Sequence, residues 1–487
     1  VLQQVEHFNS PSETQNDSFK AVSKYFDRIT RPEQILSSLP QALNTMLDPA
    51  DCGPAVISMS QDVQGEAYDY PEVFFEETIH SIRRVHPDPN QINLAAEKLR
   101  QSKKPIIISG GGVLYSEAEE EISNFAKKHN IPVTATVMGI GCMNKDDPYY
   151  ISAIGCLGEG SSNNLSRETD LALAVGTKLS DFTTGSWTNF QNEDFQLVSL
   201  NTSRFDTTKH RATPVVSDAK VGLQELSNAL GDWKAPDDWY IKAVQEKKTW
   251  DSYVAKESGP TNQELPSYAH AVGAVYRNAD PSDIVVTAAG GLVGEVVQIW
   301  KPKQLNTFET EWGFSCMGYE ISGALGIKMA KPDQDVIVFV GDGSYLLQNS
   351  DIYSSVIYNK KLIIVVCDNG GHMVINRLQL AKGGKEYLCN LRSARASNVQ
   401  FVDFEAHAKS MGANGETVKT TSELEAAFKR AKESDKTYVI SMLTHGYEWL
   451  EGSAFWESPT LEVHSTDGNK KAYEEFIEGK NKQRKGV

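Results

Sequence analysis

The chain has 487 residues, of which 40% are hydrophobic and 23% are charged, a composition typical of globular proteins. Its formal net charge of −16 disfavours nucleic acids and anionic membranes as partners, because both require a basic face on the protein. No apolar run approaches the ~20 residues of a membrane-spanning helix, so a transmembrane protein is not expected.

The first part of the chain, residues 1–75, is predicted to be rich in helix and to end on a strand. An amphipathic helix is expected from Arg31 to Met46, followed by a short buried strand at Pro54–Met59. Residues 76–92 contain Pro87 and Pro89 and are predicted to form a linker.

The second part, residues 93–235, alternates between helical and strand patterns. The alternation predicts a doubly wound parallel sheet with crossover helices. Gly110-Gly111-Gly112 follows the first strand but is not a GxGxxG motif, so it gives only weak support to a dinucleotide site. The expected elements are strands at 105–109, 133–137, 171–175 and 196–200, and a helix at 116–130.

A second linker is predicted at 236–262, and residues 263–455 alternate again as a third α/β unit. Ser422–Glu425 is predicted to act as a capping box for one helix. The tail at 456–487 is charged and polar, and its terminal basic run is expected to be solvated. The elements expected in the third unit are strands at 284–287, 336–340, 362–367 and 438–442, and helices at 317–330, 348–359 and 402–411.

Cysteine and histidine patterns suggest neither disulfides nor zinc. The six cysteines are scattered without a CxxC pair, which favours reduced, mostly buried thiols and a cytoplasmic protein. The ten histidines form no HxxxH or HxH cluster, so a zinc site is unsupported.

The most informative motif of the chain lies at the ends of two buried strands in the third unit. Gly341-Asp342-Gly343-Ser344 follows the first strand, and Asn369-Gly370-Gly371 follows the second, 27 positions further on. Open α/β sheets bind ligands at the carboxyl ends of their strands, and Mg²⁺ prefers oxygen ligands that it shares with phosphates. Asp342, the Asn369 amide and the Gly371 carbonyl are therefore predicted to bind Mg²⁺ beside a diphosphate. A GDG alone would more often be an ordinary turn, but its pairing with NGG favours the metal site.

This pair of motifs resembles that of the thiamine diphosphate-dependent enzymes of the acetolactate synthase and pyruvate decarboxylase group. The resemblance implies three α/β domains that use thiamine diphosphate and Mg²⁺, with Asp342, Asn369 and Gly371 as metal ligands. Met317, within Gly313–Glu320, matches the bulky apolar residue that bends the cofactor in these enzymes, although a core methionine would also fit the pattern. The residues expected to bind the cofactor are Gly290, Gly291, Leu292, Met317, Gly341, Asp342, Gly343, Ser344, Asn369 and Gly371.

The resemblance also assigns the three units their roles. Residues 1–75 correspond to the end of a pyrimidine-binding domain, 93–235 to a central Rossmann-like domain, and 263–455 to a diphosphate- and Mg²⁺-binding domain. In such enzymes a glutamate of the first domain activates the cofactor. A whole α/β domain needs on the order of 150 residues, and Glu6, Glu13 and Glu33 do not follow a buried strand. The first domain is therefore expected to be incomplete, with the activating glutamate upstream.

Further segments narrow the resemblance to the trihydroxycyclohexane-1,2-dione hydrolase family of myo-inositol breakdown, over almost the whole chain. These segments are Asp51–Pro54, Gln61–Tyr68, Gly313–Glu320, Gly341–Leu346 and Ile375–Gln379. The resemblance implies hydrolytic cleavage of a carbon–carbon bond in the cyclic dione to give 5-deoxyglucuronate, with the cofactor as electron sink. It also implies a homodimer or homotetramer.

His372 and Asn376 are the candidates for proton transfer in this reaction. His372 follows the metal-binding loop directly, and histidine titrates near the working pH of most enzymes. The alternative for His372 is a packing or helix-capping role.

Two other functions remain open from the sequence. The first is an acetolactate synthase-like carboligase or a 2-oxoacid decarboxylase, because these enzymes share the GDG and Met-Gly motifs. The second is a non-catalytic, cofactor-binding regulatory subunit, which the incomplete first domain would suit.

Overall fold

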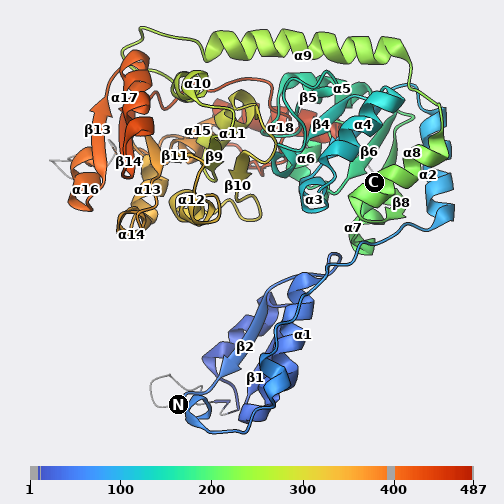
Figure 1. The fold of residues 1–487 in the computed structure, drawn as a ribbon. Helices are drawn as coiled ribbons and strands as arrows, with labels where there is room; N and C mark the ends of the chain where they lie inside the picture. The colour runs from blue at the N-terminus through green and yellow to red at the C-terminus, as the bar shows by residue number, and fades with distance from the viewer. Residues whose placement is uncertain (1–8, 11, 392–400, 485–487) are drawn as a thin grey trace.

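A parallel sheet of six strands forms the centre of each of the two larger units of the chain (Figure 1). The structure, a computed structural model, describes residues 9–10, 12–391 and 401–484. In the central domain the strand order is β5-β4-β3-β6-β7-β8. These strands are β3 (Pro105–Ser109), β4 (Val133–Ala135), β5 (Tyr150–Ala153), β6 (Leu171–Val175), β7 (Gln196–Asn201) and β8 (Thr213–Val216). Its helices are α2 (Pro89–Gln101), α3 (Gly111–Tyr115), α4 (Glu119–His129), α5 (Gly160–Glu168), α6 (Asp181–Thr184), α7 (Arg204–Thr207) and α8 (Ala219–Leu230).

The C-terminal domain also has a six-stranded parallel sheet, but its strand order differs: β10-β9-β11-β12-β14-β13. Strands β11 and β12 are buried along nearly their whole length, as expected for a parallel sheet with helices on both faces. The strands are β9 (Ile284–Thr287), β10 (Phe308–Thr310), β11 (Val336–Gly341), β12 (Ile363–Asp368), β13 (Asn414–Val418) and β14 (Tyr438–Leu443). The helices are α10 (Tyr268–Asn278), α11 (Leu292–Ile299), α12 (Tyr319–Ala330), α13 (Asp342–Leu347), α14 (Asp351–Ile357), α15 (Met373–Ala381), α16 (Phe404–Ser410) and α17 (Thr421–Glu433).

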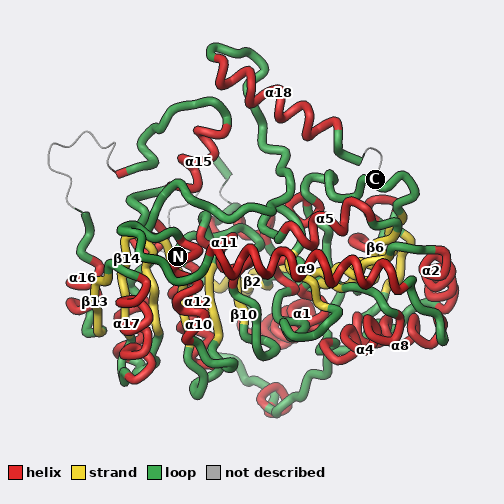
Figure 2. Tube along the Cα trace, turned by 90° about the horizontal axis from the view of Figure 1, so that it is seen from above, coloured by secondary structure: helices red, strands yellow, loops and turns green. Residues whose placement is uncertain are grey.

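Helix α9 (Asp237–Glu257) joins the two domains and runs along both of them (Figures 1 and 2). It occupies most of the segment predicted as a linker at 236–262. On the central domain, Trp239 of α9 is buried and donates its indole N–H to the Pro105 carbonyl at 2.8 Å. The connection is thus a packed helix, which gives the two domains a shared boundary.

The N-terminal unit is small and projects away from the two domains (Figure 1). Strands β1 (Tyr25–Ile29) and β2 (Ala55–Met59) form a parallel pair, with α1 (Ile35–Leu47) between them in sequence. The predicted strand at Pro54–Met59 is confirmed, and the helix expected from Arg31 begins instead at Ile35 after a short 3₁₀ turn. Strand β1 was not predicted, because its sequence YFDRI mixes charged and apolar residues and is mostly half-buried.

Most strands predicted in the two larger units are confirmed within two residues, and the predicted α/β fold class is correct. Strands β5, β8, β10 and β13 were not predicted. The helix expected at 348–359 is wrong in its bounds: α13 begins directly at Asp342, and α14 ends at Ile357. The capping box of α17 is formed by Thr420 and Glu423 rather than by Ser422 and Glu425.

The C-terminal tail is structured along much of its length. Helix α18 (Asp467–Asn481) follows an extended segment, and Lys480 forms an ion pair with Glu457 at 2.9 Å. Arg484 donates to the carbonyl oxygen of Asn192 at 2.8 Å and lies over the Phe195 ring at 5.1 Å. The prediction of a purely solvated basic run is therefore wrong for Arg484, which anchors the tail to the central domain.

Within the described ranges, no helix combines the length and the apolar character needed to cross a membrane.

Candidate active site

The GDG and NGG motifs lie side by side at the carboxyl edge of the C-terminal sheet. Strands β11 and β12 are neighbours, and Gly341 pairs with Cys367 in their parallel register. Asp342 is the first residue of α13 after β11, and Asn369 is the first residue after β12. The topology therefore brings the two side chains predicted to bind Mg²⁺ to one place.

Both side chains have buried oxygen atoms without a hydrogen-bond partner among the described residues. These are Oδ1 and Oδ2 of Asp342, which is 2% exposed, and Oδ1 of Asn369. The Asn369 amide nitrogen donates to the Tyr268 hydroxyl at 2.7 Å, which fixes the orientation of the amide. Unpaired buried oxygens are costly in a folded protein, and a cation that they could bind would remove that cost.

The electrostatics of Asp342 agree with this geometry. Burial, and then the nearby Asp368 carboxylate, raise the pKa of Asp342 to about 7. A divalent cation would offset both effects, because it favours the charged carboxylate. No group of three or more His, Cys, Asp or Glu residues suited to a metal occurs in the described part of the chain. Carboxylate, amide and carbonyl oxygens form a hard donor set, which suits Mg²⁺ better than zinc.

Gly371 is at a position that requires glycine. Its φ is +142°, and a Cβ atom there would overlap the carbonyl oxygen of Cys389. Cys389 accepts a hydrogen bond from His372 N at 2.7 Å, and Leu391 N donates to the Gly370 carbonyl at 2.8 Å. The NGG loop is thus held against the segment at 389–391, which fixes its backbone beside Asp342.

Met317 and His372 meet over Gly343. A Cβ atom at Gly343 would lie 2.8 Å from two atoms of the His372 ring and 3.5 Å from the Met317 methyl group. His372 is exposed and precedes α15, and its side chain makes no capping hydrogen bond to that helix within the described residues. The structure therefore brings together Met317, Gly343 and His372, three of the predicted site residues, at the start of α13.

Asn376 differs from His372 in its surroundings. It is fully buried one turn into α15, where its amide nitrogen donates to the Glu386 carboxylate at 2.8 Å. Its backbone N–H donates to the His372 carbonyl at 3.1 Å. These contacts make Asn376 part of the support of the loop.

Glu320 joins three segments of the site, a role that the sequence analysis missed. This buried carboxylate accepts hydrogen bonds from Gly318 N at 2.8 Å, Ser344 Oγ at 2.9 Å and Ala289 N at 3.3 Å. Burial raises the pKa of Glu320, although its hydrogen bonds oppose this shift. A charged residue at the start of the small-residue helix α12 was the only available signal in the sequence.

A cavity of about 1850 Å³ opens beside the site and is lined by residues from the N-terminal unit and both domains. From the C-terminal domain it is lined by the loop containing Gly290 and Gly291, by Glu295 of α11, and by Trp312 and Trp449. The cavity has room for a cofactor and a small substrate together. Glu295 and Trp449 were also missed by the sequence analysis, because only the folded chain brings them to one wall.

Comparison with known proteins gives two family-model matches that coincide with the two larger units. Residues 92–226 match the central domain of thiamine pyrophosphate enzymes, and residues 288–442 match their C-terminal thiamine pyrophosphate-binding domain. Fold and site thus define a thiamine diphosphate enzyme, and the predicted cofactor class is confirmed.

Curated relatives identify the family more closely. Proteins named 3D-(3,5/4)-trihydroxycyclohexane-1,2-dione hydrolase from Bacillus licheniformis, Geobacillus thermodenitrificans and Bacillus subtilis are 37%, 35% and 35% identical to this chain. Each match covers 97% of this chain and 78% of the relative. The chain belongs to the trihydroxycyclohexane-1,2-dione hydrolase family, as its sequence motifs predicted.

Proposed function

We propose that this protein uses thiamine diphosphate and Mg²⁺ to hydrolyse a carbon–carbon bond of 3D-trihydroxycyclohexane-1,2-dione, forming 5-deoxyglucuronate in myo-inositol degradation. The observation that carries the proposal is the pair of buried, unpartnered side chains Asp342 and Asn369 at adjacent strand ends, in a chain 35–37% identical to hydrolases of this name. The donor set suits Mg²⁺, and the neighbouring glycines suit a diphosphate.

The residues of the C-terminal domain have distinct parts in this proposal. Asp342, Asn369 and the Gly371 carbonyl would hold Mg²⁺, and Met317 would contact the bound cofactor. The backbone around the loop glycines and Ser344 contacts the diphosphate and the pyrimidine ring; these residues are Gly290, Gly291, Leu292, Gly341, Gly343 and Ser344. When bound, thiamine diphosphate supplies an electron sink for the carbon atom released by bond cleavage.

Water must add to one carbonyl carbon of the dione, and the proton of that water needs an acceptor. We assign this task to a ring nitrogen of His372, which lies beside Gly343 at the edge of the metal-binding loop. The proton then returns to the carbon freed by ring opening, so that one water molecule is consumed for each bond cleaved. Asn376 is assigned a positioning role, because its side chain already binds Glu386.

We also propose a homodimer or homotetramer. Helices α13 and α14, next to the metal-binding loop, expose Leu347, Tyr353 and Ile357 to 61%, 54% and 58%, and Phe314 is 91% exposed. Apolar surface of this kind on a soluble chain is typical of a subunit interface. Light scattering of the purified protein tests the assembly.

Cytoplasmic location and the absence of nucleic-acid and membrane partners remain predictions from composition.

The deciding experiment is ring opening of the trihydroxycyclohexanedione with and without thiamine diphosphate and Mg²⁺, followed by product analysis. Formation of the aldehyde acid only when both are present is expected. Turnover of pyruvate in place of the dione would indicate a carboligase or decarboxylase. Cofactor binding without turnover of either substrate would indicate a regulatory subunit.

A further inference from the structure

Helix α11 directs two buried polar side chains at the large cavity. Glu295 and Gln298, one turn apart on this helix, are 4% and 3% exposed and both line the cavity wall. Each has one oxygen atom without a hydrogen-bond partner among the described residues, Oε2 of Glu295 and Oε1 of Gln298.

The other polar atom of each side chain makes a hydrogen bond, and these two bonds fix the orientation of the carboxylate and the amide. Leu450 N donates to Glu295 Oε1 at 3.0 Å, which leaves Oε2 as the open oxygen. Gln298 Nε2 donates to the Gly158 carbonyl of the central domain at 3.2 Å. Since that carbonyl can only accept, the amide nitrogen must face it, and the amide oxygen is the atom left open.

A charged and an aromatic side chain line the same cavity as Glu295 and Gln298. The Arg377 guanidinium lies 5.0 Å from the centre of the Trp449 ring, and both residues line the same cavity. Burial raises the pKa of Glu295 to about 7, and the hydrogen bond from Leu450 N and the Arg377 charge only partly oppose this shift. This part of the cavity wall therefore combines aromatic surface, two unpaired acceptors and the Arg377 cation.

Trp449 of this wall is linked to the metal-binding loop through Tyr268. Trp449 packs edge-on against Tyr268 with ring centres 5.7 Å apart. The Tyr268 hydroxyl in turn accepts the hydrogen bond from Asn369. A molecule held by Glu295 and Gln298 would thus lie on the same side of the C-terminal domain as the proposed Mg²⁺ ligands.

Two buried acceptors without donors are costly, and a ligand rich in hydroxyl groups would remove the cost. We propose that Glu295 and Gln298 accept hydrogen bonds from hydroxyl groups of a cyclohexane polyol and so select hydroxylated cyclic diones as substrates. The inference deepens the proposed function, on which it rests, by naming the residues that choose among diones. Trp449 and Trp312 would cover the apolar faces of the ring.

Selection of hydroxylated substrates is tested by comparing two diones. The trihydroxycyclohexanedione is compared with cyclohexane-1,2-dione, which has the same carbonyls but no hydroxyl groups. For wild type, kcat/KM is expected to favour the hydroxylated dione, and Glu295→Gln and Gln298→Met are each expected to lower that ratio at least about tenfold. A merely structural role would lower kcat/KM for both diones equally, and an unchanged ratio in both variants would overturn the proposal.

Binding is tested separately by titrating the holoenzyme with myo-inositol, an unreactive cyclohexane polyol, in a calorimeter. Binding by wild type that weakens at least about tenfold in Glu295→Gln is expected. Glu309→Gln is the matched control, because Glu309 is a partly buried carboxylate of the same domain whose pKa is also raised by burial. Equal myo-inositol affinities of wild type and Glu295→Gln, or no binding of myo-inositol by wild type, would refute the proposed polyol-binding site.

The two tests separate this inference from the proposed function. If wild type opens neither dione, the proposed function fails, whereas the myo-inositol titration still reports on Glu295 and Gln298. If wild type opens the hydroxylated dione and both variants keep the wild-type ratio of kcat/KM for the two diones, the proposed function is supported. The proposed role of Glu295 and Gln298 in substrate recognition is then refuted.

Discussion

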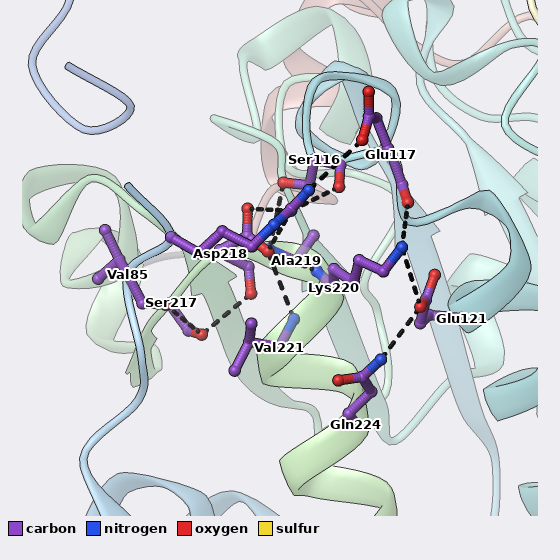
Figure 3. A network of polar contacts seen from close by, with 11 residues as sticks. Val85, Ser116, Glu117, Glu121, Ser217, Asp218, Ala219, Lys220, Val221 and Gln224 are labelled. Carbon is purple, nitrogen blue, oxygen red and sulfur yellow. Dashed lines mark hydrogen bonds and ion pairs between the residues drawn. The ribbon is translucent and has the colours of Figure 1, made fainter. Parts of the chain in front are cut away.

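The two parallel sheets of this protein each have six strands, but the carboxylates at their carboxyl edges differ in whether the protein supplies their partners. In the C-terminal domain, Asp342 and Asn369 keep buried oxygens without partners among the described residues. In the central domain the corresponding edge also lines the large cavity, but its buried carboxylate has partners within the protein. Asp218, after β8, accepts from Lys220 N and Val221 N at the start of α8 and pairs with Arg84 of the segment before α2. Figure 3 shows Asp218 at the centre of this network, close to Ser116 and Ala219.

Gly290 of the C-terminal domain differs in the same way from the glycines after β3. A Cβ atom at Gly110 would overlap the Gly176 carbonyl oxygen, and one at Gly112 would lie 2.6 Å from the Gly176 Cα. The glycines after β3 therefore serve the close packing of two loops of the same domain. At Gly290 of the C-terminal domain, by contrast, a Cβ atom would meet nothing within 4 Å. A shared fold thus does not define a ligand site, whereas unsatisfied polar groups at the strand ends do.

The largest effect that would test this contrast is expected for Asp342→Asn. The substitution removes the carboxylate charge proposed to bind Mg²⁺, so turnover should fall at least about 10³-fold, equivalent to about 4 kcal/mol. The protein without metal should melt at a higher temperature than wild type, because an unpaired buried carboxylate is gone. A ring-opening assay measures the turnover, thermal melting measures the stability, and calorimetry with Mg²⁺ and thiamine diphosphate measures the cofactor affinity.

The control for this variant is Asp283→Asn. Asp283 is also buried in the C-terminal domain, but both of its oxygens accept from Lys432, at 2.6 and 2.9 Å. This variant should be less stable than wild type and bind the cofactor normally. Normal Mg²⁺-dependent cofactor affinity in Asp342→Asn would refute the metal assignment.

The second effect concerns stability and pH. The pKa of Glu295 is about 7 in the folded protein and 4.5 as its ordinary value, so unfolding releases a proton between these two pH values. Wild type therefore loses stability as pH rises from about 4.5 to 7, and Glu295→Gln does not lose it. The variant should gain up to about 3 kcal/mol over wild type at pH 8 and almost nothing at pH 4. Urea unfolding at both pH values measures the difference, and a gain that does not vary with pH would contradict the shifted pKa.

How much of this arrangement the sequence could predict depends on how local each feature is. Strands β11 and β12 are continuous apolar runs, and the motifs that follow them are contiguous, so Asp342 and Asn369 were found from the sequence. Glu295 could not be found this way, since its hydrogen-bond partner Leu450 is 155 positions away in the chain. The role of Glu320 could not be found either, because its hydrogen bonds join three segments that are separate in the sequence.

The same distinction explains the errors in the fold. Strand β1 has no apolar alternation strong enough to mark it, and only its pairing with β2 makes it a strand. The tail residue Arg484 looks solvated in sequence because its acceptors, such as the Asn192 carbonyl, lie 292 positions away. Tertiary partners, rather than local propensity, decide these elements.

A smaller effect is expected when the support of the site is weakened at Glu320. Glu320→Gln keeps one oxygen acceptor but loses the carboxylate that binds Gly318, Ser344 and Ala289 together. Thiamine diphosphate affinity should fall about tenfold, since hydrogen bonds to a charged group contribute about 1.5–3 kcal/mol. Ser344→Ala removes only one of the three contacts and should lower the affinity less. A titration of both variants measures this order, and the reverse order would show that Glu320 does not position the three segments.

The smallest effect is expected at the carboxyl edge of the central sheet, for Arg84→Ala. The substitution leaves the Asp218 carboxylate with its contacts at the start of α8 but without its cation, so stability should fall by about 1 kcal/mol. The Arg84 side chain is 37% exposed, and solvent screening keeps the loss near that value. Cofactor affinity should stay unchanged, because no Mg²⁺ or diphosphate contact is proposed at this edge. Urea unfolding and a thiamine diphosphate titration test both expectations. Weaker cofactor binding at unchanged stability would mean that the edge near Asp218 serves the active site, and the contrast between the two sheets would no longer hold.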